Sequence, residues 1–162
     1  MSVARKIRTL ATTGWRRQAM VAEACGAMLA ARVTLAIHPF SRVSKSLGDF
    51  TRPDDPRATD HAAPTDEADA ATARAVRWAI RASAPFLPFR TVCLQQAMAA
   101  RVMLKRRGIA SVMHFGAPAE GERPIDAHAW LDAAGIKVTG YPLPDGMQEI
   151  ACFVGPPAPS AE

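Results

Sequence analysis

Hydrophobic residues in the first half of the chain recur at helical spacing. In residues 1–50 they return every three or four positions, which predicts helix until Pro39 ends the run. A second helical run begins near Asp66, with Thr65 as a candidate N-cap. Between the two runs lie residues 51–64, which are rich in Pro, Asp and Thr and hold almost no large apolar side chain. We therefore expect a loop or linker there.

The second half of the chain combines one strong helix with strands. Thr91 is a candidate N-cap for a helix from Val92 to Arg107, and Gly108 suits the left-handed position after it. Three strand-like segments follow, which are Ile109 to Ala117, Ile125 to Asp132 and Ile136 to Tyr141. The pattern predicts an α+β fold in which a helix packs on a small antiparallel sheet, after an N-terminal helical part. The expected divisions are a helical part at 1–50, a linker at 51–64, a core at 65–154 and a flexible tail at 155–162.

Composition and charge add little evidence for a special partner. Hydrophobic residues make up 49% and charged residues 22% of the chain, as in an ordinary soluble globular protein. The net charge of +5 is concentrated in five early basic residues, which are Arg5, Lys6, Arg8, Arg16 and Arg17. We interpret this run as a solvated helix face, because no zinc finger, helix-turn-helix or aromatic RNA-binding pattern accompanies it. We therefore expect no nucleic-acid partner.

Two features bear on the compartment in which the chain works. The most apolar stretch, residues 19–37, is interrupted by Glu23, so we expect a helix buried against protein and no stable membrane insertion. The three cysteines, Cys25, Cys93 and Cys152, are odd in number and far apart. This argues against disulfides and for a reducing, cytoplasmic compartment. No CxxC or HxxxH spacing is present, which argues against a structural zinc site.

Cys93 is the first candidate for chemistry. With Thr91 as N-cap, Cys93 falls in the first turn of its helix, where backbone N–H groups and the helix dipole stabilise a thiolate. The same N–H groups can bind the oxyanion of a tetrahedral intermediate. The alternative is a buried, inert cysteine, which is how most free cysteines behave.

His128 is the matching candidate for a general base. In residues 125–132 small and aliphatic side chains, including Ala129 and Leu131, alternate with polar or aromatic ones. His128 and Trp130 share the second face, so we expect His128 on the side of the strand away from the helix, or at the rim. A cysteine at a helix N-terminus followed by a histidine on a strand is the order in which a fold can bring thiol and imidazole together.

The other cysteines and His114 carry no comparable signal. His114 lies in a strand-like segment and is interpreted as structural. Cys25 belongs to the helical stripe of the N-terminal part, and packing or exposure is enough to explain Cys152.

Three segments of the chain stand in a specific combination and spacing. They are Cys93-Leu94-Gln95-Gln96-Ala97, then Leu104-Lys105-Arg106-Arg107-Gly108-Ile109, then Ala127-His128-Ala129-Trp130-Leu131-Asp132. In this combination the chain resembles the lasso peptide leader peptidases, the microcin-processing proteins of the transglutaminase-like superfamily. The resemblance runs from about residue 75 to residue 141 and implies a transglutaminase-like, papain-like cysteine protease core.

The resemblance implies a reaction and a set of partners. Cys93 would attack the scissile carbonyl of a ribosomally made precursor peptide to form a thioacyl-enzyme, while His128 accepts the thiol proton and later protonates the leaving amine. An asparagine-synthetase-like cyclase would then close the released core into a lasso. Residues 1–50 lack the alternating β-branched runs of the leader-recognition domain that some relatives carry. We therefore expect a separate leader-recognition protein, docked on the basic N-terminal helices. No cofactor or metal is implied.

The third catalytic member is where the chain departs from the family. If the hairpin turns around Ala134, the residue facing His128 is near Gly140, which has no side chain to offer. Asp132 is the first choice, because relatives usually have an acid there. The alternatives are Asp126 and Asp145.

Three other functions compete with a peptidase. A transglutaminase-like acyl transferase would use Cys93 and His128 in the same roles, with an amine in place of water. A non-catalytic adaptor of the same fold would hold a peptide and leave Cys93 with ordinary reactivity. A basic DNA-binding module rests on charge alone and is the weakest of the three.

Overall fold

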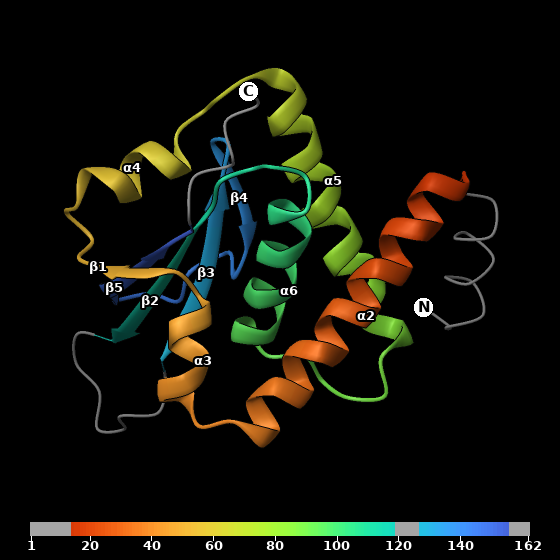
Figure 1. Cartoon of the computed structure of the whole chain (residues 1–162), viewed down its shortest axis with the longest axis horizontal. Coiled ribbons are helices and arrows are strands. Elements are labelled where there is room, and N and C mark those ends of the chain that lie inside the picture. Colours follow the sequence, from red (N-terminus) through yellow and green to blue (C-terminus); the bar gives the residue numbers. More distant parts are fainter. Residues whose placement is uncertain (1–13, 119–126, 156–162) are drawn as a thin grey trace.

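The computed structural model describes residues 14–118 and 127–155. In these residues the chain folds into one antiparallel sheet with helices on both of its faces (Figure 1). In the described residues the helices are α2 (Trp15–Ile37), α3 (Phe40–Ser46), α4 (Pro56–Ala62), α5 (Glu67–Ser83), the short 3₁₀ helix η1 (Ala84–Phe86) and α6 (Cys93–Lys105). The strands are β1 (Asp49–Thr51), β2 (Val112–Pro118), β3 (His128–Ala133), β4 (Ile136–Thr139) and β5 (Met147–Val154). They lie in the order β1-β5-β2-β3-β4.

The core fills the space between one face of the sheet and three helices. Figure 1 shows α2, α5 and α6 on one side of the sheet and α4 on the other. The largest fully buried side chains between sheet and helices include Met28, Ile80, Met103, Met113 and Leu131. On the opposite face a smaller cluster joins Ala58 of α4 to apolar side chains of β2 and β5. The predicted α+β architecture, with a helix packed on a small antiparallel sheet, is confirmed.

Helix α6 is the centre of this core. Ala97 and Ala100 are fully buried, and their small side chains let the helix approach its neighbours closely. The predicted cap at Thr91 is wrong by one residue, because Val92 takes the N-cap position. At the other end Gly108 adopts the left-handed conformation that the sequence predicted, with φ of 72°.

Charged contacts fasten α2 to the end of α6. Glu23 of α2 accepts hydrogen bonds from Arg107 at 2.7 Å and from Arg106 at 3.1 Å. The hydrogen bond from Arg107, with a smaller contribution from Arg106, lowers the pKa of Glu23 below its usual value against the opposing effect of burial. Since Glu23 is the charge that interrupts the apolar stretch of α2, its sequence position marks the side of α2 that faces α6.

The N-terminal region is helical, as predicted, and α2 ends just before Pro39. Residues 51–64, predicted to form a loop or linker, instead contain α4 and the last residue of β1. Asp55 caps α4 by accepting from the backbone of Arg57, and Pro56 occupies the first helical position. A capped helix of seven residues, about two turns, needs few large apolar residues, so the composition of the segment did not indicate it. The predicted helix within 1–13 lies outside the described residues.

Strand β5 is the largest departure from the sequence-based prediction. It pairs with both β1 and β2, so it lies inside the sheet, whereas the sequence suggested that the strands end near Tyr141. Its first half has an exposed, mixed pattern, and only Cys152, Phe153 and Val154 are buried. Cys152 is therefore a buried strand residue of the sheet.

Helix α2 is long and apolar enough to cross a bilayer by length and composition alone, with a mean hydropathy of 1.6 over its most apolar window. One face of α2 packs against α5 and α6 through Val21, Ala24, Met28 and Ala31. Only 22% of the apolar window is buried, and Leu29 and Val33 on the other face are about half exposed, so the helix is less buried than the sequence predicted.

Candidate functional site

Cys93 is the first residue of α6 and is partly buried. The N–H groups at the start of a helix have no acceptor within the helix, and Val92 provides no side-chain cap for them. Gln95 turns its side chain back, and its Oε1 accepts from the backbone N–H of Val92 at 3.3 Å. Cys93 therefore lies at the helix N-terminus where the sequence placed it, and the stabilised thiolate and the oxyanion site there stay predictions.

The start of α6 and the start of β3 lie at the same end of the fold. Near the end of α6, Arg101 donates from Nη1 to the carbonyl oxygen of Phe153 at 3.0 Å, and Phe153 pairs with Met113 near the start of β2. Helix and β2 therefore run antiparallel, so the helix N-terminus lies toward the far end of β2. There Gly116 pairs with His128. Figure 1 shows both α6 and β3 beginning at the lower end of the molecule.

His128 is held by a backbone carbonyl. Its Nε2 lies 2.6 Å from the carbonyl oxygen of Gly140. A carbonyl can only accept, so Nε2 must carry the proton, and in the neutral ring the lone pair resides on Nδ1. Nδ1 is thus the atom able to take a proton. The predicted neighbourhood of His128 and Gly140 is confirmed, with the main chain of Gly140 as the contacting group.

The ring of Trp130 sets the face on which His128 lies. Trp130 stacks between His128, at 6.2 Å between ring centroids, and His114, at 5.4 Å. Leu131, the next residue, belongs to the core beneath the helices. His128 therefore lies on the face away from α6 at the rim, as predicted. Among the described residues no hydrogen bond joins His128 to Cys93, although catalytic hydrogen bonds often tighten only when substrate is bound.

Asp132, the first choice for the third catalytic member, has other contacts. Its Oδ2 accepts from the hydroxyl of Tyr141 at 2.8 Å and lies 3.4 Å from Nε2 of His114. Burial raises the pKa of Asp132 in spite of these partners. Asp145 is exposed in the connection between β4 and β5, and Asp126 lies outside the described residues.

Gly140 can only be glycine in this conformation. Its φ is 82°, and a Cβ atom built there would lie 2.5 Å from the carbonyl oxygen of Ala129 and 2.6 Å from the Cβ of Trp130. No acidic side chain fits this position without moving β3. The same close approach brings the Gly140 carbonyl within reach of His128.

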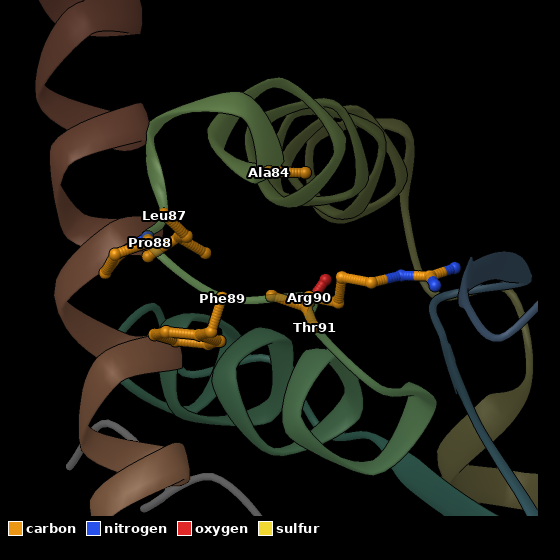
Figure 2. A pocket seen from close by; sticks show the side chains of 6 residues that line it. All are labelled: Ala84, Leu87, Pro88, Phe89, Arg90 and Thr91. Atoms are coloured by element: carbon orange, nitrogen blue, oxygen red, sulfur yellow. The ribbon is translucent and has the colours of Figure 1, made fainter.

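A pocket lies directly before Cys93 along the chain. It has a volume of about 510 Å³ and is lined by Ala84, Leu87, Pro88, Phe89, Arg90 and Thr91. Figure 2 shows Leu87, Pro88 and Phe89 on the side of the pocket near α2, while the long side chain of Arg90 extends the opposite way. The ring of Phe89 is fixed by the guanidinium of Arg32, 5.5 Å from its centroid. The pocket offers an apolar wall and a cation, and its last lining residue, Thr91, lies two positions before Cys93 in the sequence.

The two other cysteines differ from Cys93 in their surroundings. Burial raises the pKa of the Cys25 thiol. Burial, together with a hydrogen bond to Glu149, also raises the pKa of Cys152, which is fully buried. Cys152 lies beside His114 and Glu149 on the sheet face away from α6. This second group of cysteine, histidine and acid was missed from the sequence, because His114 lies 35 residues before Glu149 along the chain and residues three apart on a regular strand, such as Glu149 and Cys152, point to opposite faces.

Comparison with known proteins agrees with this geometry. A family model described as the transglutaminase-like superfamily matches residues 33–152, which is well over half of the chain and includes both Cys93 and His128. No curated protein and no solved structure matches the chain.

The contact between Gly140 and His128 predicts a specific sensitivity to substitution. Gly140→Ala should lower the free energy of unfolding more than Gly146→Ala, by at least about 1 kcal/mol, because the added Cβ meets the backbone of β3. Gly146 is the matched control, since it also has a positive φ, of 70°, but has nothing within 4 Å of its Cβ position. Urea denaturation measures both. Equal losses for the two variants would contradict the close approach.

Proposed function

The chain belongs to the transglutaminase-like superfamily, and we propose that it is a cysteine peptidase that removes the leader from a ribosomally synthesised lasso peptide precursor. The superfamily includes cysteine peptidases and acyltransferases, and both of these enzyme classes use a cysteine-dependent reaction. The observation that carries the proposal is the position of Cys93 at the uncapped N-terminus of α6. The resemblance of residues 93–97, 104–109 and 127–132 to leader peptidases supports the choice of substrate.

In the proposed reaction each residue has one task. His128 begins β3 at the rim, on the sheet face away from α6, so its ring has to reach the Cys93 thiol around the end of the strand when the peptide is bound. There Nδ1 takes the thiol proton, and the thiolate attacks the scissile carbonyl. The N–H groups at the start of α6 stabilise the oxyanion, and collapse of the intermediate releases the leaving amine with the proton from His128. Water then hydrolyses the thioacyl-enzyme. The Gly140 carbonyl orients the imidazole, a task that family members usually give to an acid. Asp132 would then affect His128 only indirectly: it accepts a hydrogen bond from Tyr141, the residue after Gly140.

The pocket before Cys93 is the proposed seat of the peptide. A side chain on the leader side of the scissile bond would lie against Leu87 and Phe89, and Arg90 would meet a carboxylate or a backbone carbonyl. An open pocket of this kind reads only a few residues. We therefore propose that a separate leader-recognition protein supplies most of the specificity and that the cyclase acts on the product. We also propose that all of these steps take place in the cytoplasm.

Replacing the nucleophile tests the peptidase directly. Cys93→Ala should abolish cleavage of the precursor, because loss of a nucleophile costs several orders of magnitude in rate, while Cys25→Ala should cleave like the wild type. Mass spectrometry of the products measures this and separates hydrolysis from acyl transfer, which would leave an added amine on the peptide. Cleavage by Cys93→Ala at the wild-type rate would refute the mechanism. Peptide binding without turnover by the wild type would favour an adaptor.

The proposed dock for the leader-recognition protein is the basic N-terminal region. Of its five basic residues Arg16 and Arg17 are described, and the guanidinium of Arg17 lies 5.3 Å from the ring centroid of Trp78 on α5. A docked partner raises the local concentration of the cleavage site, to about the millimolar range for a short connection. Charge in such a dock mainly speeds encounter.

Charge reversal tests this dock. Arg16→Glu should lower the cleavage rate only when the recognition protein is present, and added salt should lower the wild-type rate in the same way. Arg52→Glu, an exposed change outside the dock, is the matched control. Rapid, salt-independent processing by the purified chain alone would show that specificity resides in the chain itself.

A further inference from the structure

Three side chains with metal-binding atoms converge on the sheet face away from α6. Nδ1 of His114 lies 2.5 Å from Oε1 of Glu149, and Sγ of Cys152 lies 2.6 Å from the same oxygen. Sγ of Cys152 lies 3.5 Å from Nδ1 of His114. One nitrogen, one oxygen and one sulfur thus form a compact triangle, which the proposed peptidase mechanism does not use.

A β-bulge brings Glu149 into this triangle. Residues three apart on a regular strand point to opposite faces, so Glu149 and Cys152 would be separated by the sheet. The register between β2 and β5 shifts at this point, since Phe115 pairs with Ala151 whereas Gly116 pairs with Glu149. The extra residue in β5 turns Glu149 to the face of His114 and Cys152. Bulges of this kind re-aim side chains at functional sites.

The second nitrogen of His114 has an acidic neighbour. Oδ2 of Asp132 lies 3.4 Å from Nε2 of His114 and accepts from the hydroxyl of Tyr141. Histidines that bind metals usually donate their other ring N–H to a carboxylate, which fixes the tautomer and the ring orientation. Stacking on Trp130, with an angle of 6° between the ring planes, holds the same orientation.

The charges of this face favour a cation. Glu149 and Asp132 both approach His114, and among the described residues neither carboxylate forms an ion pair with a lysine or arginine. Two carboxylates and a thiol therefore converge beside the buried ring of His114.

We propose that His114 Nδ1, the Glu149 carboxylate and Cys152 Sγ form a zinc-binding site, with Asp132 as the acceptor for Nε2 of His114. Tetrahedral zinc with ordinary bond lengths separates its N, O and S ligands by about 3.3–3.6 Å. His114 and Cys152 already have this separation. The Glu149 carboxylate must withdraw by about 1 Å by the same geometry, which its partly exposed side chain permits. Water takes the fourth position.

Metal binding at this site breaks two bonds to hydrogen and forms one. The S–H bond of Cys152 breaks, its proton passes to the buffer and the thiolate sulfur binds Zn²⁺. The Nδ1–H bond that His114 directs at Glu149 also breaks, and the ring takes its proton on Nε2 instead, directed at Asp132, so that the lone pair of Nδ1 binds the metal. The site ties β2 to β5 and, through Asp132, to β3, so the bound ion raises the stability of the sheet. This inference does not rest on the proposed peptidase activity.

Titration of the metal-stripped full chain with CoCl₂ and with ZnCl₂ tests the site. Cobalt should give a thiolate-to-metal charge-transfer band and the visible bands of a tetrahedral ion, at one equivalent per chain, and zinc should displace it. Zinc should also raise the Tm. Cys152→Ser and His114→Ala should lose the charge-transfer band and lower cobalt affinity at least tenfold. Cys25→Ser and Cys93→Ser are the matched controls, and both should keep the band.

Two results would overturn the proposal, and one of them needs no variant. A folded wild-type chain that gives no thiolate–cobalt band refutes it outright. A charge-transfer band that persists in Cys152→Ser but disappears in Cys93→Ser would show that Cys93, and not Cys152, binds the metal. Circular dichroism of each variant confirms that loss of the band reflects loss of a ligand in a folded chain.

Discussion

The burial of α6 positions everything else in the described fold. Its alanine-rich faces pack between α2, α5 and the sheet with the side chains of Ala97 and Ala100 fully excluded from solvent. Two polar contacts fix the helix along its axis, from Arg101 to the main chain of β5 and from Arg107 to Glu23 of α2. Arg101 lies near the end of α6 and Arg107 just beyond it, so both contacts hold the C-terminal end of the helix. At the first turn, hydrogen bonds join Gln95 and Gln96 to the residues that precede the helix, and Cys93 there is partly buried.

A second set of contacts joins the two candidate sites across the outer face of the sheet. The Trp130 ring stacks on both His128 and His114, so one aromatic side chain orients the proposed base and a proposed metal ligand. Asp132 binds Tyr141, the neighbour of Gly140 whose carbonyl holds His128. A metal ion at His114 would therefore stiffen the same strands that position the catalytic imidazole. The two proposals remain independent in their tests, since one depends on Cys93 and the other on Cys152.

Much of this arrangement could be predicted from local patterns. The helical spacing of apolar residues and Gly108 together predicted α6. The alternation of residues along β3 predicted the face of His128. Counting residues from the hairpin turn at Ala134 predicted that Gly140 lies beside His128. Strand β5 was missed because the residues of its exposed first half do not alternate between apolar and polar. The short helix α4 was missed because its segment has the composition of a linker. The cluster around Cys152 could not be found from ligand spacing at all. His114 comes from β2 and the other two members come from β5, where only a bulge brings Glu149 to the correct face.

The central claim is that the fold activates Cys93 alone among the three cysteines. The most direct measurement is the rate of iodoacetamide alkylation of each cysteine as a function of pH, followed by mass spectrometry in the wild type and in His128→Ala. Thiol reactivity follows the thiolate fraction. Cys93 should be labelled at mildly acidic pH well before Cys25 and Cys152, whose thiol pKa values are raised by burial. His128→Ala should slow the labelling of Cys93. Equal labelling of the three cysteines, unaffected by the loss of His128, would contradict the account.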